Sequence, residues 1–367
     1  MRVERLQLRD FRCYETASLG LGPGLTVIHG PNGAGKTNLL EALYFACTGR
    51  SCRTTNEREM VRFGARATRV VLDGRDDDFP HQLSVGFAPG EAKRMTADGA
   101  PLQRLLDAPH RPLVCVFLPD RLELVKGAPG LRRAHLDQVV AGLWPARAAT
   151  RRAYAQALAQ RNALISRVRS GACAREAVAA WDLELATHGI ALRDDRASAT
   201  RSVAERFELH AGALGLTGSA TIAYRPRTQA ASPRELAAEL GERLSQDLER
   251  GFTGHGPHRD DLVFRNEGHE LRAYGSQGQQ RLALLSLLLA ERDALAAERE
   301  RPPLVLLDDV MSELDHDRRE RLARELRRGG QAIVTTTDLD HVPGARDDDV
   351  ARVEVARGAV LGDVVAA

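Results

Sequence analysis

Cysteine is scarce in this sequence, and its few cysteines form no recognisable pairing pattern. Five occur among 367 residues, an odd number without a CxxC pair, at Cys13, Cys47, Cys52, Cys115 and Cys173. Such usage fits reduced thiols better than a disulfide framework or a zinc site. We therefore expect a cytoplasmic protein.

Long apolar runs are also missing. No uncharged apolar run approaches the roughly 18 residues that a membrane span needs. The opening MRVERLQLRDF lacks the apolar core of a signal peptide. The expectation is a soluble chain that is not exported and has no membrane partner.

Net charge and aromatic side chains are low as well. The 52 Lys and Arg nearly balance 50 Asp and Glu, giving +2, so any basic surface must be local. Aromatic residues make up 4%, which argues against a platform for stacking bases. The 43% of hydrophobic residues can nevertheless form a sizeable core.

Apolar and turn residues divide the chain into an α/β head and an inserted helical arm. From about 130 to 214, Ala, Leu and Arg stretches recur at helical spacing with hardly any turn signals. We expect head residues at 1–128, an arm at 129–250, and the rest of the head at 251–367. Predicted strands lie at 25–29, 68–72, 82–87, 113–118, 220–224, 304–307 and 331–335, and predicted helices at 233–249, from about Gln277 and after Asp315.

The strongest motif follows the strand at 25–29. GPNGAGKT satisfies the P-loop template GxxxxGK[ST] and precedes the helical run NLLEALYFA. In this motif backbone amides surround phosphate oxygens, Lys36 reaches the β and γ phosphates, and the Thr37 hydroxyl ligates Mg²⁺. The predicted ATP-binding residues are Gly30, Pro31, Asn32, Gly33, Ala34, Gly35, Lys36 and Thr37.

A second element of the same chemistry is LVLLDD. An apolar strand ends in Asp308 and Asp309, as a Walker B element does. Asp308 would hold Mg²⁺, and Asp309, where most ABC ATPases have glutamate, would polarise the attacking water. A helix cap with a solvated turn is the alternative, and the P-loop upstream argues against it.

Between these motifs, SQGQQ resembles the LSGGQ signature of ABC ATPases. The residues Ser276, Gln277, Gly278 and Gln279 would contact the γ phosphate of a nucleotide held by a second subunit, which implies a two-fold dimer. A helix capped by Ser276 is the alternative. Asp315 in MSELD matches the D-loop at that interface, whereas TTTDLDH matches the switch loop only weakly, since His341 follows the strand late.

Together these motifs resemble the RecF family, whose heads are related to those of SMC proteins. The resemblance runs nearly end to end, through LQLRDFRCYE, GPNGAGKTNLLEALY, GRSCRT, FLPDRLELVKGAPGLRRAHLD, GPHRDDL, YGSQGQQR and PLVLLDDVMSELD. It implies an α/β ABC-type P-loop ATPase head, a mixed sheet with helices, split by a helical arm.

The resemblance also implies a function. Members dimerise on ATP, bind single-stranded or gapped DNA, hydrolyse ATP weakly with stimulation by DNA, and deliver recombinase with RecR and RecO in repair and the SOS response. Two features depart from the wider ABC pattern. No glutamine loop is identifiable at 117–123, and Asp309 in place of glutamate fits a slow hydrolase.

Candidate phosphate contacts are local groups of basic residues, namely Arg50, Arg53, Arg58, Arg62, Lys126, Arg132, Arg133, Arg151 and Arg152. Most exposed arginines are solvated, but Arg132 and Arg133 fall in a family motif. Binding through the backbone would be sequence-independent and salt-dependent. GPHRDDL could place His258 and Arg259 near the nucleotide or the dimer interface, or could be a turn held by Asp260 and Asp261.

Two other functional classes compete with a DNA-binding ATPase. The ATP-binding subunit of a membrane transporter would use the same head, but its helical insert is short and it carries a glutamine loop. A small-molecule kinase would share the P-loop, but the SQGQQ and MSELD motifs have no function in a kinase. The long arm favours the DNA-binding ATPase.

Overall fold

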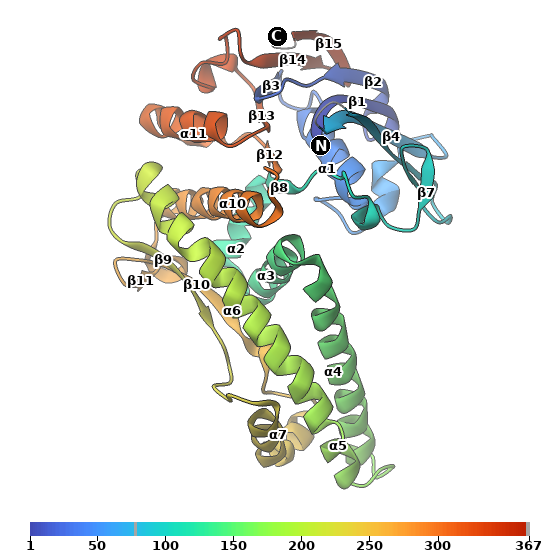
Figure 1. The fold of residues 1–367 in the computed structure, drawn as a ribbon, viewed down its shortest axis with the longest axis vertical. Coiled ribbons are helices and arrows are strands. Elements are labelled where there is room, and N and C mark those ends of the chain that lie inside the picture. Colours follow the sequence, from blue (N-terminus) through green and yellow to red (C-terminus); the bar gives the residue numbers. More distant parts are fainter. Residues whose placement is uncertain (77–78, 365–367) are drawn as a thin grey trace. The chain divides into compact units, whose positions relative to one another are not determined.

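The chain forms two compact units. The computed structural model describes residues 1–76 and 79–364 (Figure 1). The first unit contains Met1–Arg121 and Leu295–Ala367, and the second contains Leu122–Ala294. No helix in the described ranges is both long and apolar enough to cross a membrane.

One six-stranded sheet of the first unit is antiparallel. Its strand order is β2-β1-β4-β5-β6-β7. The strands are β1 (Arg2–Phe11), β2 (Tyr14–Gly20), β4 (Thr68–Asp76), β5 (Phe79–Phe87), β6 (Arg94–Ala97) and β7 (Ala100–Leu102). Burial alternates along β1, so one face of the sheet packs on the core and the other is open.

The other sheet of the first unit is mostly parallel, in the order β15-β14-β3-β13-β12-β8. Its strands are β3 (Leu25–His29), β8 (Val114–Phe117), β12 (Leu304–Leu307), β13 (Ala332–Thr336), β14 (Ala351–Ala356) and β15 (Ala359–Val364). The sequences LVLL and AIVTT are buried throughout, as expected for central parallel strands.

Helix α1 (Lys36–Thr48) supplies the core of the first unit. Its side chains Leu39, Leu40 and Phe45 are fully buried in one cluster with residues of both sheets. Helix α11 (His316–Arg328) buries Leu322 and Leu326. Short 3-10 helices are η1 (Glu57–Met60), η2 (Leu105–Asp107), η3 (Pro119–Leu122), η6 (Met311–Glu313) and η7 (Leu339–His341).

The second unit combines the arm helices with a three-stranded sheet, β11-β10-β9. Its helices are α2 (Glu123–Lys126), α3 (Pro129–Leu143), α4 (Ala148–Arg169), α5 (Glu176–Ala179), α6 (Asp182–Ala213), α7 (Pro233–Glu242), α8 (Leu244–Arg250), α9 (Leu271–Tyr274) and most of α10 (Gln277–Arg299), with η4 (Pro145–Arg147) and η5 (Pro257–Arg259). Its strands are β9 (Ala220–Arg225), β10 (Asp261–Asn266) and β11 (His269–Glu270).

The expected strands and helices are confirmed, apart from one helix. The helix expected at 233–249 is two helices that part at Arg243, just after Gly241, a residue with low helix propensity. The domain boundaries differ more. The division at Ala294 and Leu295 lies beyond the expected boundary at 250, because β10 pairs with β9 and packs on α3. The SQGQQ segment therefore belongs to the second unit.

Candidate functional site

The loop between β3 and α1 is shaped by two glycines in close contact with neighbouring backbone and side chains. Gly30 has φ +152, and a Cβ there would lie 2.0 Å from the Val355 carbonyl oxygen. Gly35 has φ +111, and a Cβ there would lie 2.6 Å from the Tyr14 hydroxyl. Only glycine fits either position, so the tight loop that opens α1 depends on both.

Lys36 folds back over this loop. Its ammonium group donates to the carbonyl oxygens of Gly30 at 2.7 Å and Pro31 at 3.0 Å, and the side chain is only 7% exposed. Burial lowers the lysine pKa, while the nearby carboxylates of Asp309 and Asp308 oppose that shift. A cation is thus held beside the loop amides, where it can meet a phosphate.

Thr37 and Asp308 meet although 271 positions separate them. The threonine hydroxyl lies 2.9 Å from both carboxylate oxygens of Asp308, which directly follows the buried strand β12. Thr335, at the end of β13, donates to the same carboxylate at 2.7 Å. Hydroxyl and carboxylate oxygens are the donors that Mg²⁺ prefers, so this group can hold that ion.

Asp309 takes an unusual conformation next to this group. Its φ is +47, and its amide donates to the Thr335 hydroxyl at 2.9 Å. Its Oδ1 is buried without a hydrogen-bond partner among the described residues. A strained residue with an unpaired buried oxygen beside a cation site is a candidate catalytic group.

A buried glutamate in α1 forms a polar cluster that the motif analysis did not predict. Glu41 is fully buried and accepts a two-pronged contact from Arg12, at 2.8 and 2.7 Å. Ser51 and Arg53 also donate to it, and Arg53 donates to Asn38 in the first turn of the helix. A lone acidic residue within the apolar run NLLEALYFA was the available signal.

The SQGQQ segment starts helix α10 in the second unit. The Ser276 hydroxyl accepts from the Gln279 amide at 3.2 Å, and the Gln279 side chain accepts from the Ser276 amide at 2.9 Å. This reciprocal arrangement is a capping box, so the helix-cap interpretation holds in this structure. Gln277 and Gly278 occupy the first turn, and Gln280 is anchored by donation to the Leu271 carbonyl.

The D-loop and switch candidates also sit at helix starts. Asp315 caps α11 by accepting from the Arg318 amide at 3.0 Å. Asp338 caps η7 in the same manner, and its amide donates to the Thr336 hydroxyl. His341 has a buried Nδ1 without a hydrogen-bond partner in the described part of the chain.

The candidate DNA contacts divide into paired and unpaired residues. Arg132 is 2% exposed and holds the Asp261 carboxylate at 2.7 and 2.9 Å, so any phosphate contact would have to break this pair. Arg133 donates to the Asp260 carbonyl. Ion pairs or hydrogen bonds also engage Arg53, Arg62, Lys126 and Arg151, whereas Arg50, Arg58 and Arg152 are exposed with no ion pair among described residues.

The GPHRDDL segment is held by its two carboxylates. Asp260 is fully buried and accepts from the Tyr224 hydroxyl and from the Arg227 amide. Asp261 pairs with Arg132. His258 is hydrogen-bonded to Tyr154 at 2.7 Å within the same unit. These contacts agree with the interpretation of the segment as a turn held by Asp260 and Asp261.

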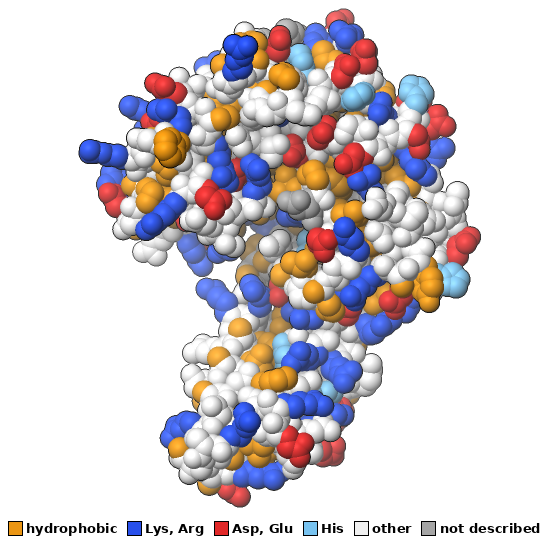
Figure 2. Space-filling model, turned by 180° about the vertical axis from the view of Figure 1, so that it is seen from behind, with side chains coloured by type: hydrophobic (Ala, Val, Ile, Leu, Met, Phe, Trp, Pro, Cys, Tyr) orange, Lys and Arg blue, Asp and Glu red, His pale blue; other side chains and the backbone are white. Residues whose placement is uncertain are grey.

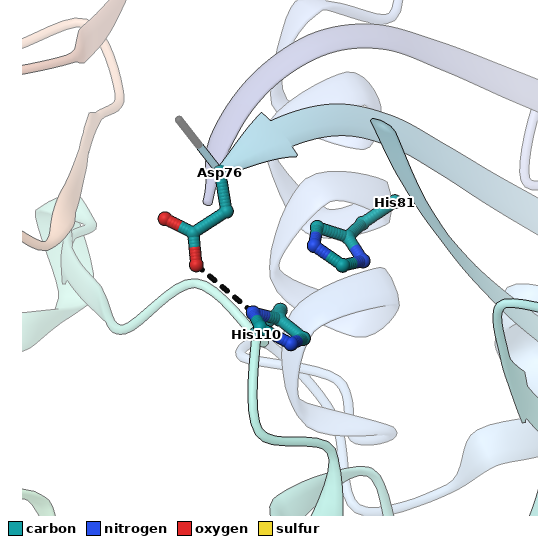
Figure 3. Close-up of side chains that lie close together, drawn as sticks. All are labelled: Asp76, His81 and His110. Atoms are coloured by element: carbon teal, nitrogen blue, oxygen red, sulfur yellow. Dashed lines mark hydrogen bonds and ion pairs between the residues drawn. The ribbon is translucent and has the colours of Figure 1, made fainter. Parts of the chain in front are cut away.

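A further cluster, formed by Asp76, His81 and His110, has residues typical of a metal site (Figure 3). The two imidazole rings are stacked, with centroids 3.9 Å apart and planes at 12°. A metal must lie close to the plane of each ligating ring, which two stacked rings cannot provide at one point. Asp76 also pairs with Arg301 at 3.0 Å. The cluster is better explained as an ion-pair network than as a metal site.

Known proteins resemble this chain along its whole length. A family model described as AAA domain matches residues 5–81. The DNA replication and repair protein RecF of Anaeromyxobacter sp. (strain Fw109-5) is 38% identical, covering 98% of this chain and 99% of that protein. A solved structure of the recombination mediator protein RecF-ATP in the RecFOR pathway is 25% identical with a TM-score of 0.87, covering 99% and 97%. An SmcHead structure bound to the C-winged helix domain of ScpA, at 15% identity and TM-score 0.59 over 99% and 98%, shares the fold.

Proposed function

The chain belongs to the RecF family, and on this premise we propose that it is an ATP-dependent DNA-binding protein of recombinational repair and replication restart. The observation that carries the proposal is the contact of Thr37 with Asp308, 2.9 Å apart, beside Lys36. This contact joins the P-loop helix to the end of a buried strand. A nucleotide-binding group is thereby assembled within one unit.

The first step is binding of ATP. The amides of the loop Gly30 to Gly35 and the ammonium of Lys36 bind the phosphates. Thr37 and Asp308 hold Mg²⁺, which neutralises charge on the phosphates when bound. Asp309 orients the attacking water, and its shorter reach compared with glutamate fits slow hydrolysis that acts as a timer.

The second step is closure of a two-fold dimer. Ser276, Gln277, Gly278 and Gln279 form a helix N-terminus whose amides and hydroxyl can bind the γ phosphate held by a partner copy. Asp315 lines the same interface. Loss of the γ phosphate removes the bridging ligand, so nucleotide state controls the population of dimer.

The third step is binding of single-stranded or gapped DNA through its phosphate backbone. The protein then helps to load recombinase with RecR- and RecO-like partners in the cytoplasm and supports the SOS response. The alternative function, the ATP-binding subunit of a membrane transporter, has no support among the relatives reported above. The curated RecF relative reported there is named a DNA replication and repair protein.

Sedimentation tests this sequence of steps. Wild type and Ser276→Arg are compared with and without ATP and Mg²⁺, and then with a gapped duplex. We expect ATP to convert wild type to a dimer that holds DNA, and the variant to bind ATP but stay monomeric. The bulky cation would fill the position of the partner's phosphate.

Ser232→Arg provides the matched control. Ser232 caps α7 by accepting from the Glu235 amide at 3.3 Å, while the Glu235 side chain accepts from the neighbouring Ala231 amide, so both variants lose a similar serine cap. The control is expected to dimerise like wild type. If wild type stays monomeric with ATP and ignores DNA, the proposed function is wrong.

A further inference from the structure

Arginine side chains form a row across the open face of the antiparallel sheet. Arg9 on β1 lies opposite Arg69 on β4 and, on its other side, opposite Thr16 on β2. Arg69 in turn lies opposite Gly86 on β5, which lies opposite Arg94 on β6. All three arginines are exposed, so the row presents guanidinium groups from three strands on one face.

This placement is unfavourable for the sheet alone. Like charges directly opposite each other on neighbouring strands repel. Among the described residues, neither Arg9 nor Arg69 has an ion pair, and Arg69 donates only to the Ser84 hydroxyl, at 3.1 Å. Arg94 reaches Glu91 at 3.5 Å, with both side chains largely exposed. The two facing arginines, Arg9 and Arg69, therefore lack the carboxylates that would neutralise them within the fold.

An ordinary arginine-rich surface does not account for this pattern. Several exposed arginines elsewhere in the chain have acidic neighbours, such as Arg151 with Asp137 at 3.1 Å and Arg327 with Asp347 at 2.8 Å. A solvated surface usually alternates its charges in this way. The row on the sheet instead places one sign of charge on adjacent strands.

The next row along the strands is neutral and rich in hydrogen-bond donors. It consists of Ser18, Gln7, Val71, Ser84 and Thr96. A carboxylate appears only one row further, at Asp73, where Gln7 and Gln82 donate to it. Guanidinium, hydroxyl and amide groups are the side chains that contact nucleic-acid phosphates.

The length of the row fits a nucleic-acid strand. From β1 to β6 it spans three strand spacings, about 14 Å at roughly 4.8 Å each. Successive phosphates of one strand lie closer together than the length of this row, so the row can face several of them. Figure 2 shows Lys and Arg side chains, with Asp and Glu side chains among them, along the side of the molecule where β4 and β7 of Figure 1 lie.

We propose that the open face of this sheet, through Arg9, Arg69 and Arg94, binds the phosphate backbone of DNA. The proposal rests on the DNA-binding function above and specifies the surface that performs it. The β1–β2 hairpin that carries Arg9 also contacts the P-loop helix, since Arg12 pairs with Glu41 and Cys13 accepts from Asn38. DNA and nucleotide thus meet opposite sides of one hairpin.

A salt titration of DNA affinity tests the proposal. A triple variant, Arg9→Gln, Arg69→Gln and Arg94→Gln, is compared with wild type by fluorescence anisotropy on a labelled gapped duplex with ATP and Mg²⁺. Each lost phosphate contact lowers the slope of log affinity against log salt by roughly 0.7 to 0.9. We expect the slope to fall by about 2 to 3 and the affinity at low salt to fall at least about tenfold.

Two matched variants control for net charge and for side-chain loss. Arg201→Gln, Arg234→Gln and Arg243→Gln remove three exposed charges from the second unit and are expected to leave the slope near that of wild type. Replacing the three row arginines with lysine retains the charge and is expected to retain most of the slope.

The possible outcomes distinguish an error in the proposed DNA-binding surface from an error in the proposed function. If wild type binds DNA and the glutamine variant has the same slope of log affinity against log salt, the proposal for this sheet face is wrong. The proposed DNA-binding function is then unaffected. An equal loss in the second-unit control also overturns the proposal for this sheet face, because the effect is then one of net charge. Failure of wild type to bind DNA contradicts the proposed function itself. ATP binding by the glutamine variant, expected to be normal, confirms that it is folded.

Discussion

Arginines serve opposite purposes in the two units. In the second unit, Arg161 is fully buried and donates to Asp182 and Asp247, each at 2.7 Å. On the open sheet of the first unit, Arg9 and Arg69 are exposed, face each other and have no carboxylate partner among the described residues. The comparison shows that the surroundings of an arginine, rather than its presence, indicate whether it holds the fold or contacts a ligand.

The largest effect is expected at Arg161. Arg161→Met leaves two buried carboxylates unpaired, which should lower the free energy of unfolding by about 3–5 kcal/mol. Urea denaturation, together with hydrogen exchange of the α4 amides, measures the loss. Arg152→Met is the control in the same helix, because Arg152 is exposed and has no ion pair among described residues, and it should change stability by no more than about 0.5 kcal/mol.

The contrast between buried and exposed arginines would fail if Arg161→Met and Arg152→Met had equal stability. It would be sharpened by a triple variant in which Arg161, Asp182 and Asp247 all become apolar. That variant removes the charges together, so it should recover much of the loss seen with Arg161→Met.

Acid should weaken the second unit through His258. Burial, assisted by Arg259 and Arg133, lowers its pKa to about 4. The unfolded chain binds a proton near pH 6.5 and the folded chain does not, so this contribution is full above pH 6.5 and is lost as the pH falls toward 4. The free energy of unfolding should drop by at most about 3 kcal/mol over that window.

Unfolding measured at pH 7 and pH 4.5 tests this expectation. His258→Gln removes the titrating group and should reduce the pH dependence, whereas His316→Gln, at an exposed position of α11, should not. An unchanged pH dependence in the first variant would show that other groups cause the acid sensitivity.

The smallest effect on stability is expected on the antiparallel sheet, where the substitution should stabilise the protein instead of destabilising it. Arg9→Gln removes a like-charge contact with Arg69 and should raise stability by a few tenths of a kcal/mol, roughly 0.2 to 0.5. Arg5→Gln is the matched control two rows away on the same face, because Arg5 lies opposite Asp73 and its removal loses an attraction. Thermal unfolding of both variants tests the reversal. Destabilisation by Arg9→Gln would remove the argument that the row is unfavourable for folding.

Local patterns were sufficient to predict much of the nucleotide-binding site. The strands at β3 and β12 and the start of α1 follow from apolar runs bounded by glycine and aspartate, and Thr37 and Asp308 do meet. The helical arm followed from the long periodic stretch between 130 and 214. These features depend on residues close in sequence, where periodicity and turn chemistry carry the information.

Features that depend on tertiary pairing could not be predicted. The row of arginines becomes visible only when the register of β1 against β4 and of β5 against β6 is known. Arg132 was assigned to a possible DNA contact from its motif, but its partner Asp261 lies 129 positions away. The compact second unit extends to Ala294, beyond the predicted boundary at 250, and the pairing of β9 with β10 that contributes to it is not evident locally.

Glu41 constrains how this sequence can diverge. From within the P-loop helix, its carboxylate joins residues of two other segments, Arg12 in one and Ser51 and Arg53 in the other. Replacing Glu41 alone leaves Arg12 without its buried counter-charge, and replacing Arg12 alone leaves the buried Glu41 with only Ser51 and the longer contact to Arg53, so each single change is costly. Substitutions at these positions should therefore occur together in functional descendants, and a library that randomises them one at a time should recover far fewer active proteins than one that randomises them jointly.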